Sequence, residues 1–69
     1  MVAKYNLAFI NHDLCARDNG RVVGYDNSHG DHHRHFAGAE EKFAFVSYER
    51  LLEQFLNEVR ELRQKKEPI

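Results

Sequence analysis

The chain has 69 residues, of which 42% are hydrophobic and 30% are charged. This balance excludes wholesale disorder, and the length allows one domain, residues 1–69, with a core small enough to benefit from a partner, a metal or self-association. A net charge of −1 with neutral histidines excludes strong bulk attraction to nucleic acid at neutral pH, although protonation of the five histidines would raise it to about +4.

The cellular setting follows from what the sequence lacks. Cys15 is the only cysteine, so an internal disulfide is excluded and nothing argues for an oxidising compartment. No apolar run approaches the roughly 20 residues of a membrane helix, and the first residues lack the apolar region of a signal peptide. We therefore expect a cytoplasmic protein that makes no use of a membrane.

The first predicted element is a half-buried strand from Lys4 to Ile10. Apolar and polar residues alternate there, which places Tyr5, Leu7 and Phe9 on one side. Asn11-His12-Asp13 then interrupts the pattern.

A β-hairpin is predicted next. Asn19-Gly20 is a strong signal for a two-residue type I′ turn, because both residues tolerate positive φ. The arms would be Leu14–Arg17 and Arg21–Tyr25. Cross-strand pairing would then place four residues on the core face: Leu14, Ala16, Val23 and Tyr25. The other, more solvated face would carry Asp13, Arg17, Val22 and Asp26.

The middle of the chain predicts two further strands. Residues 27–31 combine Asn, Ser, Gly and Asp and are typical of a turn. A third strand is expected over His32–Phe36 and a short fourth over Phe43–Val46, separated by a loop of small and charged residues, 37–42. These elements predict a meander.

The last predicted element is a helix from about Tyr48 to Lys65. Ser47 is a favourable N-cap, and apolar residues recur at three- and four-residue spacing at Tyr48, Leu52, Phe55, Val59 and Leu62. The expected fold is α+β, a small antiparallel β-meander of three to four strands followed by one C-terminal amphipathic helix. One helix covers one sheet face, so the other face or an edge strand stays available to a second chain, and we expect a homodimer.

Four of the five histidines fall within residues 29–35, which is the most unusual feature of the sequence. His33 and His35 are two residues apart in the predicted strand, so their side chains point to the same side, where they could share a divalent metal ion. Asp26 and His29 are further candidate ligands, because carboxylate oxygen and imidazole nitrogen both bind such ions. The cofactor, if any, stays open.

The same histidines also suit acid-base chemistry. One imidazole could act as base and the other as acid in RNA cleavage, while Arg34 stabilises charge at the phosphate. Alternation turns His32 and Arg34 to the opposite side, so these two residues would lie at the rim. The candidate catalytic residues are His33, His35, Arg34 and Asp26; the candidate substrate-binding residues are Tyr25, Asn27, His32 and His29.

The segment Gly24-Tyr25-Asp26-Asn27-Ser28-His29-Gly30, followed by His32-His33-Arg34-His35-Phe36, resembles the TumE family of bacterial toxin-antitoxin proteins. In that family a Tyr-Asp-Asn segment precedes a His-His-basic-His segment. The resemblance implies a toxin component whose partner is a DNA-binding antitoxin of helix-turn-helix type. It also marks as important Tyr25, Asp26, Asn27, His32, His33 and His35.

Three functions therefore stay open at the level of the sequence. The first is a toxin that acts on RNA through the histidine cluster, which would make the protein a ribonuclease. The second is a non-enzymatic module that forms homodimers or a complex with an antitoxin. The third is a histidine metal-binding domain, and an ordinary polar surface is the alternative to all three.

Overall fold

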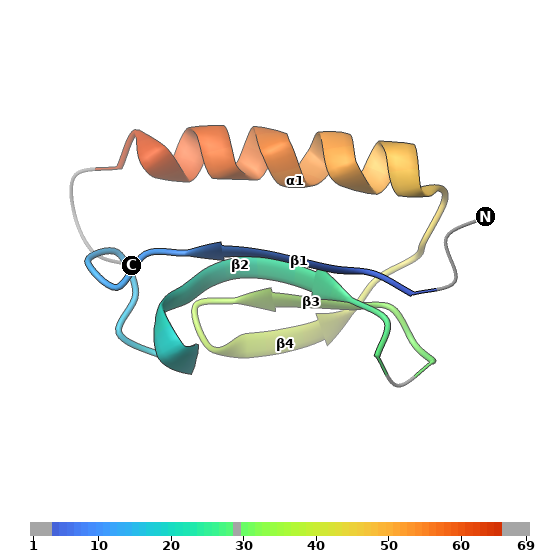
Figure 1. The fold of residues 1–69 in the computed structure, drawn as a ribbon, viewed down its shortest axis with the longest axis horizontal. Coiled ribbons are helices and arrows are strands. Elements are labelled where there is room, and N and C mark those ends of the chain that lie inside the picture. The colour runs from blue at the N-terminus through green and yellow to red at the C-terminus, as the bar shows by residue number, and fades with distance from the viewer. Residues whose placement is uncertain (1–3, 29, 66–69) are drawn as a thin grey trace.

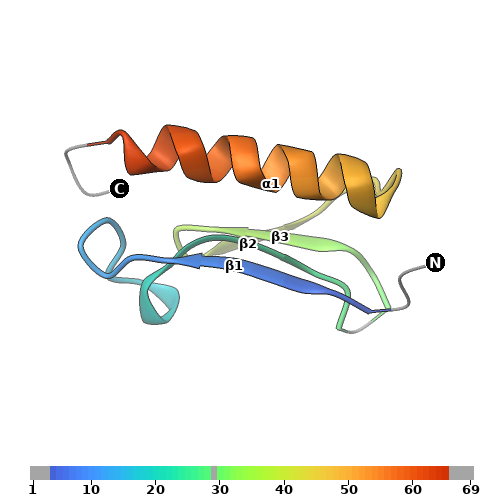
Figure 2. The same ribbon diagram turned by 45° about the horizontal axis from the view of Figure 1, so that its top comes forward.

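The computed structural model describes residues 4–28 and 30–65. They form a four-stranded antiparallel sheet in the order β1-β2-β3-β4, followed by one helix, which confirms the expected α+β fold. The elements are β1 (Asn6–Ile10), β2 (Arg21–Asp26), β3 (His33–Phe36), β4 (Ala39–Lys42) and α1 (Tyr48–Arg63), with a short helical turn, η1 (Asp18–Gly20), before β2. Figures 1 and 2 show α1 running along one side of the sheet.

The sheet register assigns each strand residue to a face. Leu7, Tyr25 and Arg34 lie opposite one another across the three strands β1, β2 and β3, and so share a face. Tyr25 hydrogen-bonds to the side chain of Gln54 in α1, so this is the face that α1 covers. The core lies between α1 and this face, with buried side chains that include Val23, Tyr25, Leu51, Phe55 and Leu62.

The helix begins as the sequence predicts. The Ser47 hydroxyl accepts a hydrogen bond from the Arg50 backbone N–H at 3.2 Å, which is the expected N-cap. Leu51, Phe55 and Leu62 are buried, and each such side chain contributes roughly 2 kcal/mol by leaving water. Within the part of the chain that the structure describes, no helix is both long and apolar enough to span a membrane.

The predicted hairpin at Asn19-Gly20 is wrong. β2 pairs with β1 across a long connection, and residues 14–17 form no strand. The side chain of Asn11 accepts hydrogen bonds from the N–H groups of Asp13 and Leu14, at 2.9 and 3.2 Å, which turns the chain before a strand can form. Leu14 is buried as expected, but Ala16 is exposed.

The tight turn lies instead between β3 and β4. Phe36 pairs with Ala39, so the loop contains only Ala37 and Gly38, whose φ angles of 48° and 91° are those of a type I′ turn. The strand predicted over Phe43–Val46 is therefore wrong, and β4 occupies 39–42, which the sequence indicates as loop. Both Phe43 and Phe45 are half-buried and pack against the core from the connection to α1.

Val22 was expected on the solvated face, yet it is fully buried. The cause is a β-bulge: Phe9 pairs with Val23 but Ile10 pairs with Arg21, so Val22 is an extra residue opposite β1. The bulge interrupts the simple alternation on which the expectation depended.

Candidate functional site

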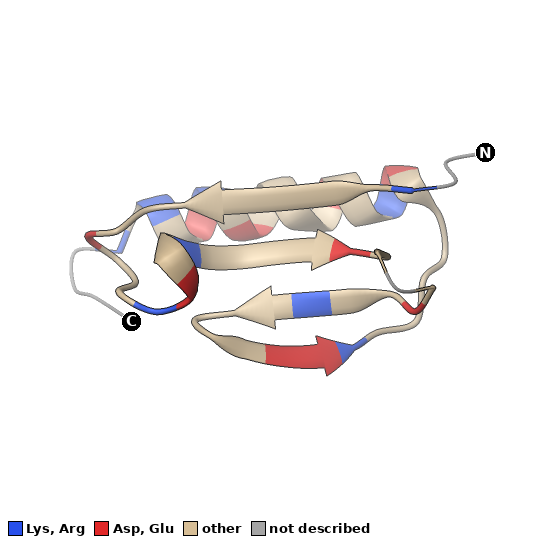
Figure 3. Cartoon of the chain, turned by 60° about the horizontal axis from the view of Figure 1, so that its bottom comes forward, with Lys and Arg blue, Asp and Glu red and all other residues tan. Residues whose placement is uncertain are grey.

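The face of the sheet away from α1 carries the two strand histidines. Figure 3 shows the molecule from this side, with α1 behind the strands. The residues that the register assigns to it are Asn6, Ala8, Gly24, Asp26, His33, His35, Glu40 and Lys42, and we call this surface the histidine face. The expectation that His33 and His35 share one side of a strand agrees with this register.

His35 is held between two carboxylates. Its Nε2 lies 2.8 Å from Oδ2 of Asp26, and its Nδ1 lies 3.9 Å from Oε2 of Glu40. An ionised carboxylate only accepts hydrogen bonds, so Nε2 carries the proton in this pair. Nδ1 is then the nitrogen of a neutral His35 that can take up a proton.

His33 stands beside this pair. Its Nε2 lies 3.7 Å from Oε1 of Glu40, so one carboxylate lies near both imidazoles. The side chains of His33 and His35 are each 13% exposed. Both rings are therefore recessed in the histidine face, with a small accessible area each.

Asp26 is ionised and fixed in place. Burial alone would raise its pKa, but hydrogen bonds from the backbone of Ser28 and from His35 outweigh burial, and the pKa lies below the ordinary value. The Ser28 N–H and hydroxyl both donate to Oδ1, at 3.3 Å. The same carboxylate thus bonds the turn after β2 and orients His35.

Arg34 and Tyr25 lie on the helix-facing side, away from the histidines. Arg34 donates to the Tyr25 hydroxyl at 3.1 Å through Nε, to Glu41 at 3.3 Å through Nη1, and to Glu58 through Nη2. The Tyr25 hydroxyl donates to Glu58 and accepts from Gln54 at 2.9 Å. All three guanidinium nitrogens of Arg34 are engaged, and Tyr25 is fully buried, so neither side chain reaches the histidine face.

The electrostatics of this network favour a charged arginine. Burial lowers the pKa of Arg34, but its bonds to Glu58 and Tyr25 outweigh burial and raise it. Burial and the Glu58 carboxylate raise the pKa of Tyr25, so its hydroxyl stays protonated. The network joins α1 to β2 and β3 rather than forming part of the histidine site.

His32 and Asn27 hold one end of the sheet together. The Tyr5 hydroxyl lies 2.6 Å from Nδ1 of His32, and the His32 ring stacks on Phe45 with centroids 4.3 Å apart. Oδ1 of Asn27 accepts a hydrogen bond from the Tyr5 backbone N–H at 2.9 Å. His29 lies outside the described residues.

The metal hypothesis gains no geometric support. Among residues 4–28 and 30–65, no group of three or more His, Cys, Asp or Glu side chains is arranged to hold a metal ion. His33, His35 and Asp26 are part of that range, whereas the fourth candidate, His29, is not.

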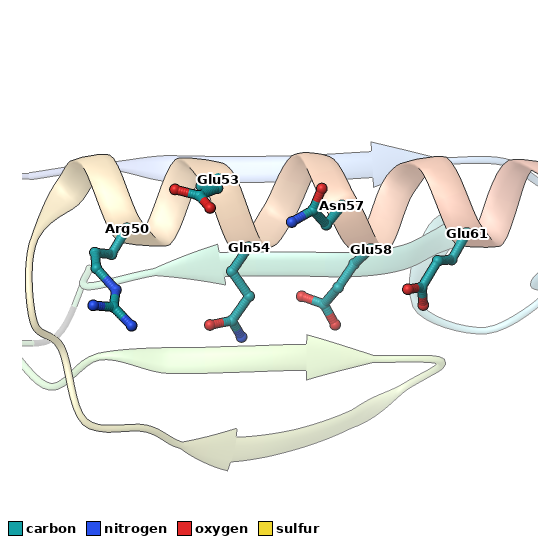
Figure 4. A pocket seen from close by; sticks show the side chains of 6 residues that line it. All are labelled: Arg50, Glu53, Gln54, Asn57, Glu58 and Glu61. Atoms are coloured by element: carbon teal, nitrogen blue, oxygen red, sulfur yellow. The ribbon is translucent and has the colours of Figure 1, made fainter.

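A shallow hollow of about 250 Å³ lies along α1 and was not expected from the sequence. Figure 4 shows its lining, which consists of Arg50, Glu53, Gln54, Asn57, Glu58 and Glu61. Gln54 and Glu58 are the members that bond to Tyr25. The hollow is thus the outer side of the network described above.

The sequence matches the family described as Toxin TumE over residues 2–63. The chain belongs to the TumE toxin family. This agrees with the resemblance carried by Tyr25-Asp26-Asn27 and the histidine segment, and it supports a toxin of a toxin-antitoxin pair, with an antitoxin as partner. No curated protein and no solved structure matches the chain.

Sequence reasoning missed Glu40 as a neighbour of His33 and His35. Glu40 could be found once Ala37-Gly38 is taken as the turn, because the register then pairs it with His35. The pairing of Arg21 with Ile10 could not be found in this way, because it depends on the bulge in β2.

Proposed function

We propose that this TumE-family chain is a toxin that cleaves RNA with His33 and His35. The observation that carries the proposal is the pair of imidazoles on one sheet face, with Asp26 bonded to His35 at 2.8 Å. Alternate residues of a strand lie about 7 Å apart, a separation that two imidazoles can bridge across one phosphodiester.

The reaction needs two proton transfers. One imidazole removes the proton of a ribose 2′-hydroxyl as the 2′-oxygen attacks phosphorus. The other donates a proton to the 5′-oxygen as the P–O5′ bond breaks, which leaves a 2′,3′-cyclic phosphate and a new 5′-hydroxyl. Asp26 acts as a positioning residue, because it fixes the ring of His35 and the nitrogen that carries its proton.

The other sequence candidates have indirect roles in this proposal. Tyr25 and Arg34 join α1 to the sheet, while Asn27 and His32 hold the turn and the strand ends. These bonds connect β2 and β3 to the segments around them, so their loss would disturb the histidines through the fold. The cation that the reaction requires must then come from another residue.

We also propose that the chain forms a homodimer when alone and binds an antitoxin of helix-turn-helix type. Within the described residues the outer edges of β1 and β4 pair with no strand, and an open edge favours pairing with a second chain. Ile10 and Leu56 are 52% and 51% exposed, which adds apolar surface for such contacts.

Growth arrest on controlled expression tests the proposal. We expect His33→Ala and His35→Ala each to abolish the arrest. His12→Ala is the matched control, because it removes an exposed histidine outside β3, and it should preserve the arrest. Circular dichroism of each purified variant checks that the fold is intact. Arrest that survives both strand substitutions in folded protein would remove the histidines from the mechanism.

A non-enzymatic interaction module is the second candidate, favoured by the open strand edges. It predicts that the chain binds its antitoxin firmly while RNA incubated with the free protein stays intact. Cleavage of that RNA would exclude it.

A further inference from the structure

The proposed RNA cleavage needs a cation beside the histidines. Lys42 pairs with His33 on the histidine face, but its ammonium is bonded to Asp31 at 3.2 Å and its side chain is 74% exposed. Asp26 and Glu40 are both close to the imidazoles and would repel a phosphate. Arg34 cannot compensate, because its guanidinium is bonded to Glu41 and Glu58 on the other face. A cation for the phosphate must therefore come from another basic residue on the histidine face.

The bulge in β2 brings Arg21 to the histidine face. In a regular strand Arg21 would share a side with Val23 and Tyr25, which face α1. Arg21 instead pairs with Ile10, and the extra residue Val22 shifts the alternation. Bulges commonly redirect a side chain in this way next to functional sites.

Gly24 gives Arg21 the room to lie across the sheet. A Cβ atom added at Gly24 would lie 2.8 Å from Cδ of Arg21, so the arginine stem occupies the space above this glycine. Gly24 pairs directly with His35, and the Cβ positions of such cross-strand neighbours are roughly 5 Å apart. The stem of Arg21 therefore crosses the position in β2 that pairs with His35.

The guanidinium of Arg21 is only partly engaged. Its Nε donates to Oδ2 of Asp18 at 2.6 Å. Its two terminal nitrogens have no hydrogen-bond partner among the residues that the structure describes, and the side chain is 21% exposed. This differs from Arg34, and two free terminal nitrogens suit a phosphate, which guanidinium groups bind with paired hydrogen bonds.

We propose that Arg21 binds the RNA phosphate beside His33 and His35, and that Gly24 is the bare position across which it reaches. The inference rests on the proposed RNA cleavage. The Asp18 carboxylate accepts a hydrogen bond from Nε of Arg21 and offsets the positive charge of the guanidinium. Loss of the Arg21 charge should therefore weaken RNA binding, whereas loss of the Asp18 charge should strengthen it.

The test is binding of a fluorescein-labelled, single-stranded RNA of 20 nucleotides, measured by anisotropy over a range of salt concentrations. We expect Arg21→Ala to weaken binding about 10-fold and to lower the salt dependence by about one phosphate contact. Arg21→Lys should recover part of the affinity. Arg50→Ala removes the same charge from an exposed position of α1 and should leave affinity within about 2-fold.

Asp18→Asn separates a binding role from a structural one. Asn tolerates the left-handed backbone of residue 18, where φ is 50°. A merely structural ion pair predicts that Asp18→Asn and Arg21→Ala weaken RNA binding alike, whereas phosphate binding predicts that Asp18→Asn strengthens it. Thermal melting of both variants accompanies the binding data.

The outcomes for the two proposals differ. If the wild-type chain cleaves RNA but Arg21→Ala binds and cleaves as the wild type does, Arg21 is excluded and the histidine proposal stands. If the wild-type chain neither binds nor cleaves RNA, both proposals fail. Loss of binding in Arg21→Ala together with a gain in Asp18→Asn supports the assignment.

Discussion

The imidazole of His35 and the carboxylate of Asp26 form a direct pair, with Nε2 and Oδ2 2.8 Å apart, on the sheet face opposite α1. The pair joins β3 to the end of β2 and to the turn that Ser28 begins. It therefore links the stability of the sheet to the orientation of a residue in the proposed site.

Asp26→Asn should make the stability of the protein less dependent on pH. The pKa of Asp26 is lowered in the folded state, so its ionised form stabilises the fold above the ordinary value of 3.8, and this contribution is lost as pH falls through the folded pKa. We expect the substitution to cost about 1–3 kcal/mol at pH 7 and less at pH 3. Urea unfolding at the two pH values measures this, and an equal cost at both would contradict it.

Tyr25→Phe should weaken the fold without touching the histidine face. It removes a buried hydroxyl that bonds to Glu58, Arg34 and Gln54, and each of these partners loses one bond. We expect a loss of about 1–3 kcal/mol in the free energy of unfolding. Tyr48→Phe is the matched control, because the Tyr48 hydroxyl has no hydrogen-bond partner within the described residues. Equal losses in the two variants would refute the network's role.

The turn between β3 and β4 offers opposite substitutions at adjacent positions. Ala37 has a φ of 48°, a left-handed conformation that asparagine tolerates better than alanine because its short polar side chain bonds locally. Ala37→Asn should therefore stabilise the protein by about 0.5–1 kcal/mol. Gly38→Ala should destabilise it by about 1–2 kcal/mol, because φ is 91° and the new Cβ would lie 3.1 Å from Cβ of Arg17. Thermal melting that shifts both variants in the same direction would argue against a type I′ turn.

Self-association should be visible in the free protein. We expect sedimentation equilibrium at micromolar concentration to give twice the chain mass of 8.1 kDa. Ile10 is the last residue of β1 and is 52% exposed. Ile10→Lys places a charge there and should favour the monomer if this strand edge forms the contact. A species of 8.1 kDa alone for the wild type would rule out the dimer.

The sequence predicted the elements whose periodicity is strong. Leu7 and Phe9 alternate in β1, just after Tyr5, and the helix carries both a cap at Ser47 and a regular apolar stripe. The shared side of His33 and His35 follows from the same period of two, so it needed no tertiary information.

The errors arise where local signals compete. Asn19-Gly20 is the stronger turn signal in sequence, but Asn11 turns the chain ahead of it, and Asp18 and Asn19 adopt left-handed conformations within a longer connection. Ala37-Gly38 forms the two-residue turn although alanine is unusual there. Once that turn is misplaced, β4 and the partner Glu40 are misplaced with it.

The position of Arg21 depends on a long-range feature. The bulge exists only in the pairing of β1 with β2, and no residue of β2 by itself indicates it. This is why Arg34, the arginine between the histidines in sequence, was the candidate cation, although alternation alone already turned it away from them.

Cleavage of a defined RNA by the purified chain in the presence of EDTA tests the central claim most directly. We expect the wild-type protein to yield fragments that end in a 2′,3′-cyclic phosphate, and folded His33→Ala and His35→Ala proteins to be at least about 100-fold slower. RNA that stays intact with the wild-type protein, or is cut equally fast by both variants, would contradict it.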